Sequence, residues 1–183
     1  QIRFSPTGSV TLLLGTISHG QGHETVFTQV LCDQLGIDPT KVRVVEGDTD
    51  QVTMGTGTFG SRSAALAGSA IKLAADKVID KAKTIAAHIL EASTDDIEFA
   101  EGIFRIAGTD REANLNDIAA LAFNADRLPL EIEPGLDETA IFNPAAPNFP
   151  NGCHVVEAEI DPDTGKVALM EYSIVDDVGV TLN

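Results

Sequence analysis

The chain has 183 residues, enough for one domain with its own core or for two small subdomains that share one. Its 28 acidic and 12 basic side chains give a formal net charge of −16, which argues against duplex DNA and anionic membranes as partners. The apolar stretches are short or interrupted by charge, so no membrane span is expected. Any anionic ligand must therefore be held by local devices such as backbone N–H groups, helix N-termini or a well-placed arginine.

The first part of the chain has the pattern of strand, loop, helix and strand. Residues 9–15 contain a short apolar run that predicts a strand, and a Gly-rich stretch follows at residues 16–23. Apolar residues then recur at three- and four-residue spacing over residues 26–35, which predicts a helix that Gly36 ends. Residues 42–45 predict a second strand.

A second polar stretch, rich in Gly and Thr, covers residues 46–60. It is too long for a simple connection, and loops of this length are usually functional or disordered. A broad apolar face then predicts a long helix that starts at Ser61 and runs to about residue 90. Beyond it, two short apolar runs flank Glu101 and Gly102, a pattern typical of a hairpin.

The remainder mixes short elements. A short helix is predicted over residues 114–123, and a second hairpin is predicted from the alternating runs that flank residues 161–165. The whole indicates an α+β fold of mixed strands and two principal helices, one of them long, each preceded by a Gly-rich loop. We divide the chain into residues 1–94 with both loops and the long helix, 95–125 with a hairpin and a short helix, a Pro-rich connector at 126–151, and a hairpin at 152–183.

The two Gly-rich loops share one design, because each leads directly into a helix N-terminus. The first amides of a helix lack intrahelical partners and its dipole is positive there, so both places suit an anion. Gly20 and Gly22 allow a ligand close to the backbone, and Gln21 between them can donate and accept hydrogen bonds. Arg62 suits a phosphate in bidentate geometry. Together the loops predict a phosphorylated, extended, hydrogen-bonding ligand.

Simpler interpretations stay open for these residues. The Gly-Gln-Gly run is an ordinary turn in many proteins, Ser61 is interpretable as a helix N-cap alone, and Arg62 as a surface ion pair alone. Cys32 and Cys153 have no paired spacing, so neither a disulfide framework nor a zinc site is expected, and Cys32 is predicted to be a buried apolar residue.

Side-chain metal sites are not expected. His19 and His23 are close in sequence, but no third ligand is placed beside them. Glu46, Asp48 and Asp50 resemble part of a calcium loop that lacks its terminal glutamate.

Several motifs follow one another along the entire chain. They are G-T-I-S-H-G-Q-G-H-E-T at residues 15–25, E-G-D-T-D at 46–50, G-T-G-T-F-G-S-R-S at 55–63, E-P-G-L at 133–136, F-P-N-G-C-H-V at 149–155, E-I-D-P-D-T-G at 159–165 and D-D-V-G-V-T-L-N at 176–183. In this order they resemble the molybdopterin-binding large subunit of the xanthine dehydrogenase, aldehyde oxidase and carbon monoxide dehydrogenase family. The resemblance is greatest to the carbon monoxide dehydrogenase large-chain branch, and it implies that the chain is a fragment of such a subunit.

The resemblance implies an oxidoreductase that holds molybdenum on molybdopterin cytosine dinucleotide. Such enzymes oxidise carbon monoxide, an aldehyde or an N-heterocycle with oxygen taken from water, and they pass electrons to iron–sulfur and flavin subunits or domains. The implied location is cytoplasmic, while membrane association or export of the parent and self-association of the fragment stay open. The resemblance assigns cofactor binding to His19, Gly20, Gln21, Gly22, Thr58, Phe59, Gly60, Ser61, Arg62 and Ser63, with Phe59 and Gly60 nearer the metal.

The resemblance also implies what this chain lacks. The catalytic glutamate of the family lies in a downstream G-x-G-E motif, so no catalytic residue is expected here, and the isolated fragment should lack both cofactor and turnover. Two other hypotheses are a non-catalytic nucleotide- or anion-binding assembly module and a purely structural interaction domain.

Overall fold

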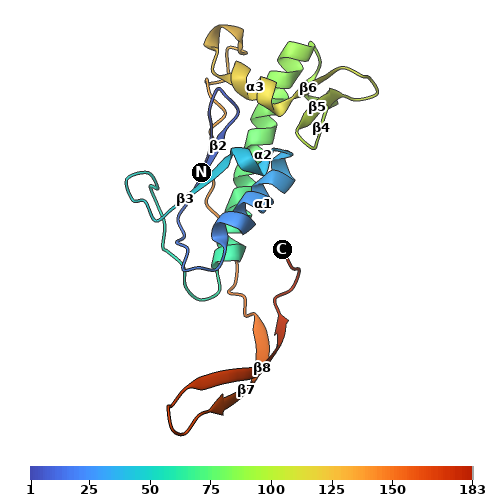
Figure 1. Ribbon diagram of the computed structural model, residues 1–183. Helices are drawn as coiled ribbons and strands as arrows, with labels where there is room; N and C mark the ends of the chain where they lie inside the picture. The colour runs from blue at the N-terminus through green and yellow to red at the C-terminus, as the bar shows by residue number, and fades with distance from the viewer. Residues whose placement is uncertain (183) are drawn as a thin grey trace. The chain divides into compact units, whose positions relative to one another are not determined.

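The computed structural model describes residues 1–182 and divides the chain into two compact units, residues 1–145 and 146–183. The α+β prediction is confirmed, because helices α1 (His23–Leu35), α2 (Ser63–Leu90) and α3 (Leu115–Ala122) occur together with short strands (Figure 1). Single 3₁₀ turns lie at Pro39–Lys41, Thr94–Asp96 and Ala125–Arg127. No helix of the described residues combines the length and the apolar character that a membrane crossing requires.

The first sheet contains a β-α-β unit. Its strands lie in the order β1 (Ile2–Phe4), β2 (Val10–Leu14) and β3 (Val42–Glu46), with β1 antiparallel to β2 and β2 parallel to β3. Helix α1 is the crossover that two adjacent parallel strands require. Leu14 pairs with Glu46, so the carboxyl ends of β2 and β3 lie at one edge of the sheet. The loops that follow these strands therefore start next to each other.

Helix α1 buries one stripe and ends where the sequence predicts. Phe27, Leu31 and Leu35 are buried at four-residue spacing, and Gly36 closes the helix in the left-handed conformation with φ +64°. Cys32 is half-buried, so the prediction of a buried cysteine is wrong. One residue along a helix turns about 100° away from its neighbour, which places Cys32 beside the buried stripe. Burial, followed by nearby acidic groups, raises the pKa of its thiol.

Helix α2 begins two residues later than predicted. Ser61 has a left-handed backbone with φ +54°, which a right-handed helix cannot contain, and Arg62 is the N-cap before the first helical residue, Ser63. Gly60 is also left-handed, with φ +62°, so the second loop turns sharply before the helix starts. The buried stripe of α2 is rich in alanine, which permits close packing against its neighbours.

The second sheet is an antiparallel meander of β4 (Ile97–Ala100), β5 (Ile103–Ile106) and β6 (Glu112–Asn114). Positive φ angles of 48° at Glu101 and 79° at Gly102 suit the tight turn of the predicted hairpin. Strand β6 escaped prediction because three residues are too few to show an alternating pattern.

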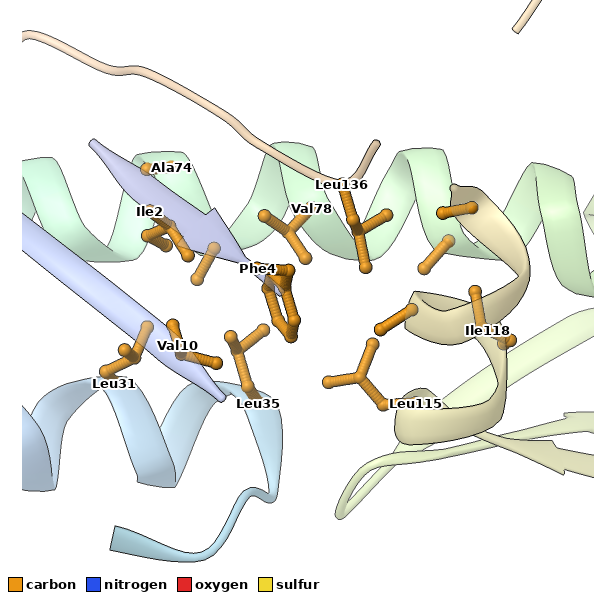
Figure 2. Packing of buried hydrophobic residues seen from close by; sticks show 14 of the residues in the cluster. Ile2, Phe4, Val10, Leu31, Leu35, Ala74, Val78, Leu115, Ile118 and Leu136 are labelled. Carbon is orange, nitrogen blue, oxygen red and sulfur yellow. The ribbon is translucent and has the colours of Figure 1, made fainter. Parts of the chain in front are cut away.

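The hydrophobic core of residues 1–145 joins both sheets to the helices. In Figure 2 the ring of Phe4 lies between Leu35 of α1 and Val78 of α2, with Leu115 of α3 nearby. Leu136, from the Pro-rich segment, is fully buried in the same cluster. This segment is irregular, but its packing makes it part of the core.

The unit of residues 146–183 contains one long hairpin of β7 (Asn151–Ile160) and β8 (Val167–Asp177), which pair antiparallel with a bulge at Glu157 and Ala158. At its turn, the carboxylate of Asp161 accepts backbone N–H groups two and three residues later, and these hydrogen bonds lower its pKa. Side chains on both faces of this hairpin are exposed.

The helix end at Gly36 provides a test of this packing. A Cβ at Gly36 would overlap the backbone of Glu101 and Gly102, and its left-handed φ penalises any side chain by about 1–2 kcal/mol. Gly36→Ala should therefore lower the free energy of unfolding by more than about 1 kcal/mol, measured by urea unfolding followed by circular dichroism. The matched control is Gly68→Ala inside α2, where a Cβ meets nothing within 4 Å, and it should leave stability unchanged or raised. Equal stabilities of the two variants would contradict this account.

Candidate functional site

The two Gly-rich loops are in direct backbone contact. Residues 15–22 follow β2 and residues 47–62 follow β3. The N–H of Gly57 donates to the carbonyl of Gly15 at 3.0 Å. A Cβ on Gly15 would lie 2.6 Å from the Cα of Gly55, so this approach requires residues without side chains.

Thr58 joins the first loop to the start of α2. Its hydroxyl oxygen accepts the backbone N–H of Ile17 at 3.0 Å and the hydroxyl of Ser63 at 3.0 Å. The structure therefore gives Thr58 and Ser63, both predicted as cofactor-binding residues, a role in holding the loops together. This role does not depend on a ligand.

A cavity of about 390 Å³ lies between these loops and the starts of α1 and α2. Gly20 and Gly22 are the two predicted site residues that do not line it. Both have positive φ angles and open space around them, so they shape the first loop. The lining consists of His19, Gln21, His23, Val26, Phe27, Thr58, Phe59, Gly60, Ser61, Arg62, Ser63 and Ala64.

The lining of this cavity contains no Asp or Glu among the described residues, although the chain carries 28 of them. Arg62 supplies a permanent positive charge, and its guanidinium carbon lies 4.7 Å from the ring centroid of Phe59. Within residues 1–182 Arg62 makes no ion pair, so its interpretation as a surface ion pair is wrong. The charge of Arg62 is thus available to a ligand.

A second, mostly apolar cavity of about 230 Å³ shares Arg62 and Ser63 with the first. Met54, Leu66 and Phe142 are among its lining residues, all within residues 1–145. Arg62 therefore borders two hollows, an arrangement that suits an extended ligand.

The two helices that start at the cavity have no side-chain caps. Gly22 at α1 and Arg62 at α2 make no capping hydrogen bond through a side chain. In contrast, α3 is capped by Asn114, whose side chain accepts the N–H of Asp117 at 2.9 Å. The interpretation of Ser61 as an N-cap is wrong. The first amides of α1 and α2 remain available to an anionic ligand.

The first loop orients Gln21 by an internal contact. The backbone N–H of His19 donates to the side-chain oxygen of Gln21. The amide nitrogen of Gln21 then carries the hydrogen atoms that remain for a ligand.

A buried polar cluster beside the cavity escaped prediction. Nδ1 of His23 lies 2.9 Å from Oε1 of Glu46, and the hydroxyl of Thr16 donates to the same oxygen. The three residues come from the start of α1, the end of β3 and the second position after β2. The strand, helix and strand predicted over residues 9–45 could have indicated that the ends of β2 and β3 lie together, but not which side chains meet there. No group of three or more His, Cys, Asp or Glu side chains within residues 1–182 is arranged to hold a metal ion.

Comparisons with known proteins agree in one assignment. A family model described as the molybdopterin cofactor-binding domain matches residues 1–183. The carbon monoxide dehydrogenase large chain of Hydrogenophaga pseudoflava is 38% identical over 184 residues, which are 100% of this chain and 23% of that protein. The 6-hydroxypseudooxynicotine dehydrogenase complex subunit gamma of Paenarthrobacter nicotinovorans is 37% identical over 182 residues, again 100% of this chain and 23% of that protein.

Solved structures show the same relationship. A crystal structure of the Cu,Mo-CO dehydrogenase in its carbon monoxide reduced state matches with a TM-score of 0.85 and 38% identity, covering 100% of this chain and 23% of that one. Quinoline 2-oxidoreductase from Pseudomonas putida 86 matches with a TM-score of 0.79 and 33% identity, with the same coverage. The chain thus spans less than a quarter of the length of these relatives, and it belongs to the molybdopterin cofactor-binding domain family of the molybdenum hydroxylases.

Proposed function

We propose that the cavity between the two Gly-rich loops binds the molybdopterin cofactor in its cytosine dinucleotide form. In this proposal the chain is the cofactor-binding part of the large subunit of a molybdenum hydroxylase. The observation that carries it is the convergence of both loops, two uncapped helix starts and Arg62 on one cavity without acidic side chains.

The residues present fit such a ligand. A dinucleotide carries phosphates, which accept hydrogen bonds from helix-start amides and pair with a guanidinium. Gln21 offers N–H donors to a heterocycle or phosphate, and the ring of Phe59, 56% exposed, offers an apolar face. The two cavities that share Arg62 provide room for an extended molecule.

Roles can be proposed for the rest of the site. The loop from His19 to Gly22 would face the pterin and phosphate region, and the loop from Thr58 to Ser63 would face the opposite side, with Phe59 and Gly60 nearer the metal. When bound, the cofactor supplies a redox-active molybdenum centre for oxidation with oxygen from water. The residues of this chain bind and orient it, and they supply no catalytic acid or base in this proposal.

The activity of the parent subunit is a further part of the proposal. We propose carbon monoxide, an aldehyde or an N-heterocycle as the substrate, iron–sulfur and flavin subunits or domains as electron-transfer partners, and a cytoplasmic location. Relatives named as carbon monoxide dehydrogenase, a dehydrogenase complex subunit and quinoline 2-oxidoreductase support this range.

Arg62→Ala in the full-length subunit tests the phosphate contact. A hydrogen bond to a charged group contributes about 1.5–3 kcal/mol, so the affinity of the subunit for the cofactor should fall roughly 10- to 100-fold. The purified variant should therefore retain less molybdenum and less cytidine nucleotide. The measurement is metal analysis together with nucleotide released by acid. Arg105→Ala is the control, because Arg105 is exposed and pairs with Glu112 on the second sheet. Unchanged cofactor content in the Arg62 variant would contradict its assigned role.

Gly15→Ala tests the contact between the loops. The added Cβ must displace the backbone of Gly55, so the cavity should change shape while both sheets and all helices remain. We expect cofactor content of the full-length subunit to fall at least about tenfold, with far-ultraviolet circular dichroism unchanged. Gly68→Ala is again the matched control, and equal cofactor content in both variants would argue against the loop contact as a requirement.

The isolated chain tests where catalysis resides. Residues 1–183 alone should show no molybdenum-dependent oxidation of carbon monoxide, aldehydes or N-heterocycles, because the proposal places no catalytic group in them. The reconstituted full-length subunit should oxidise one of these substrates. Turnover by the isolated chain would refute the proposal that residues 1–183 contain no catalytic group.

A further inference from the structure

We infer that His23 is an additional cofactor-binding residue, whose Nε2 accepts a hydrogen bond from an N–H or O–H group of the ligand. We further infer that Glu46 and Thr16 are positioning residues that act through His23. The inference rests on the proposed function and deepens it, because none of these three residues is among those to which the loop motifs assign cofactor binding.

The position of Nε2 follows from burial and hydrogen bonding together. The side chain of His23 is only 7% exposed and lines the cavity. Its Nδ1 is bonded to Glu46, while its Nε2 has no hydrogen-bond partner among residues 1–182. Yet the described residues contain no fully buried side-chain nitrogen or oxygen that lacks a partner. The small exposed area of His23 therefore includes Nε2, and the open space beside this residue is the cavity.

The imidazole ring is held by Glu46 and Phe27, and Thr16 in turn fixes Glu46. Oε1 of Glu46 accepts both Nδ1–H of His23 and the hydroxyl of Thr16, and the Glu46 side chain is only 9% exposed. The ring of Phe27 packs against the imidazole with centroids 4.8 Å apart. Since Glu46 lies on β3 and Phe27 on α1, the ring cannot rotate without breaking contacts to two separate elements. A group held this way binds its ligand without first losing conformational freedom.

The contact with Glu46 also selects the chemistry of Nε2. A carboxylate accepts hydrogen bonds, so Nδ1 carries the hydrogen, and in the neutral ring Nε2 then presents a lone pair. A lone pair repels phosphate oxygens and accepts from N–H and O–H groups. The pterin ring system and ribose hydroxyls bear such groups, whereas the phosphates are left to Arg62 and the helix-start amides. His23 thus recognises the N–H and O–H groups of the ligand, whereas Arg62 and the helix-start amides bind its phosphates.

Two substitutions at His23 separate binding from folding. His23→Asn keeps an amide N–H near the position of Nδ1 for Glu46 and removes the atom that faces the cavity. His23→Gln places an amide near the position of Nε2 and gives up the contact with Glu46. His88→Asn is the matched control, because His88 is an exposed histidine on α2.

The variants are compared in the full-length subunit by two measurements. The first is the molybdenum and cytidine nucleotide content after purification, and the second is the unfolding temperature of subunits made in cells that cannot synthesise the cofactor. We expect His23→Asn to lower cofactor affinity about tenfold or more with a nearly unchanged unfolding temperature. We expect His23→Gln to unfold at a lower temperature and yet keep more cofactor than His23→Asn.

The positioning role of Glu46 predicts an intermediate result. Glu46→Gln keeps the shape of the side chain but no longer offers a charged acceptor, so the imidazole is held less firmly. Its cofactor content should lie between those of the wild-type subunit and the His23→Asn subunit.

The measurements separate a binding role of His23 from a purely structural one. Full cofactor content in His23→Asn would overturn the inference, as would cofactor losses that follow the unfolding temperature across all variants, since both indicate a purely structural role. A wild-type subunit that contains neither molybdenum nor cytidine nucleotide would instead overturn the proposed function itself, so the two failures are distinguishable.

Discussion

The parallel pairing of β2 with β3 is the constraint on which the site depends. Because Leu14 lies opposite Glu46, both strands end at the same edge, and open α/β arrangements bind ligands at the carboxyl ends of their strands. The loops that leave this edge meet through Gly15 and Gly55, where only glycines permit the approach. The same pairing brings Glu46 next to Thr16 and within reach of the first residue of α1.

The charge of the cavity lining at this edge is opposite in sign to that of the chain as a whole. The chain is strongly acidic, but the cavity lining contains Arg62 and no carboxylate among the described residues. Glu46 lies behind His23, and two donors occupy the same carboxylate oxygen. An anionic ligand therefore meets amide hydrogens and a guanidinium, whereas dissolved salt screens the repulsion from more distant surface charges.

Several features could be predicted because they depend on local patterns. The apolar spacing of α1, the stop at Gly36 and the hairpin turn at Glu101 and Gly102 each follow from nearby residues. The predictions were wrong where contacts between distant residues, and not neighbours in sequence, determine the local structure. The start of α2 moved to Ser63 because the preceding loop needs left-handed residues to turn back toward the first loop. Strand β6 was missed because three residues are too few to show an alternating pattern, so that only its pairing with β5 defines it.

The sequence by itself determined the fold class, the two Gly-rich loops and the family. The fold class follows from the periodicity of apolar residues, and the loops and the family follow from contiguous motifs and their order. Only the tertiary structure decided that the loops share one cavity, that Thr58 holds them together and that the helix starts lack side-chain caps. It also decided that His23 and Glu46 form one buried pair. A single sequence does not show which residues far apart in the chain are in contact. Here the pairing of β2 with β3 places Glu46 beside the first turn of α1.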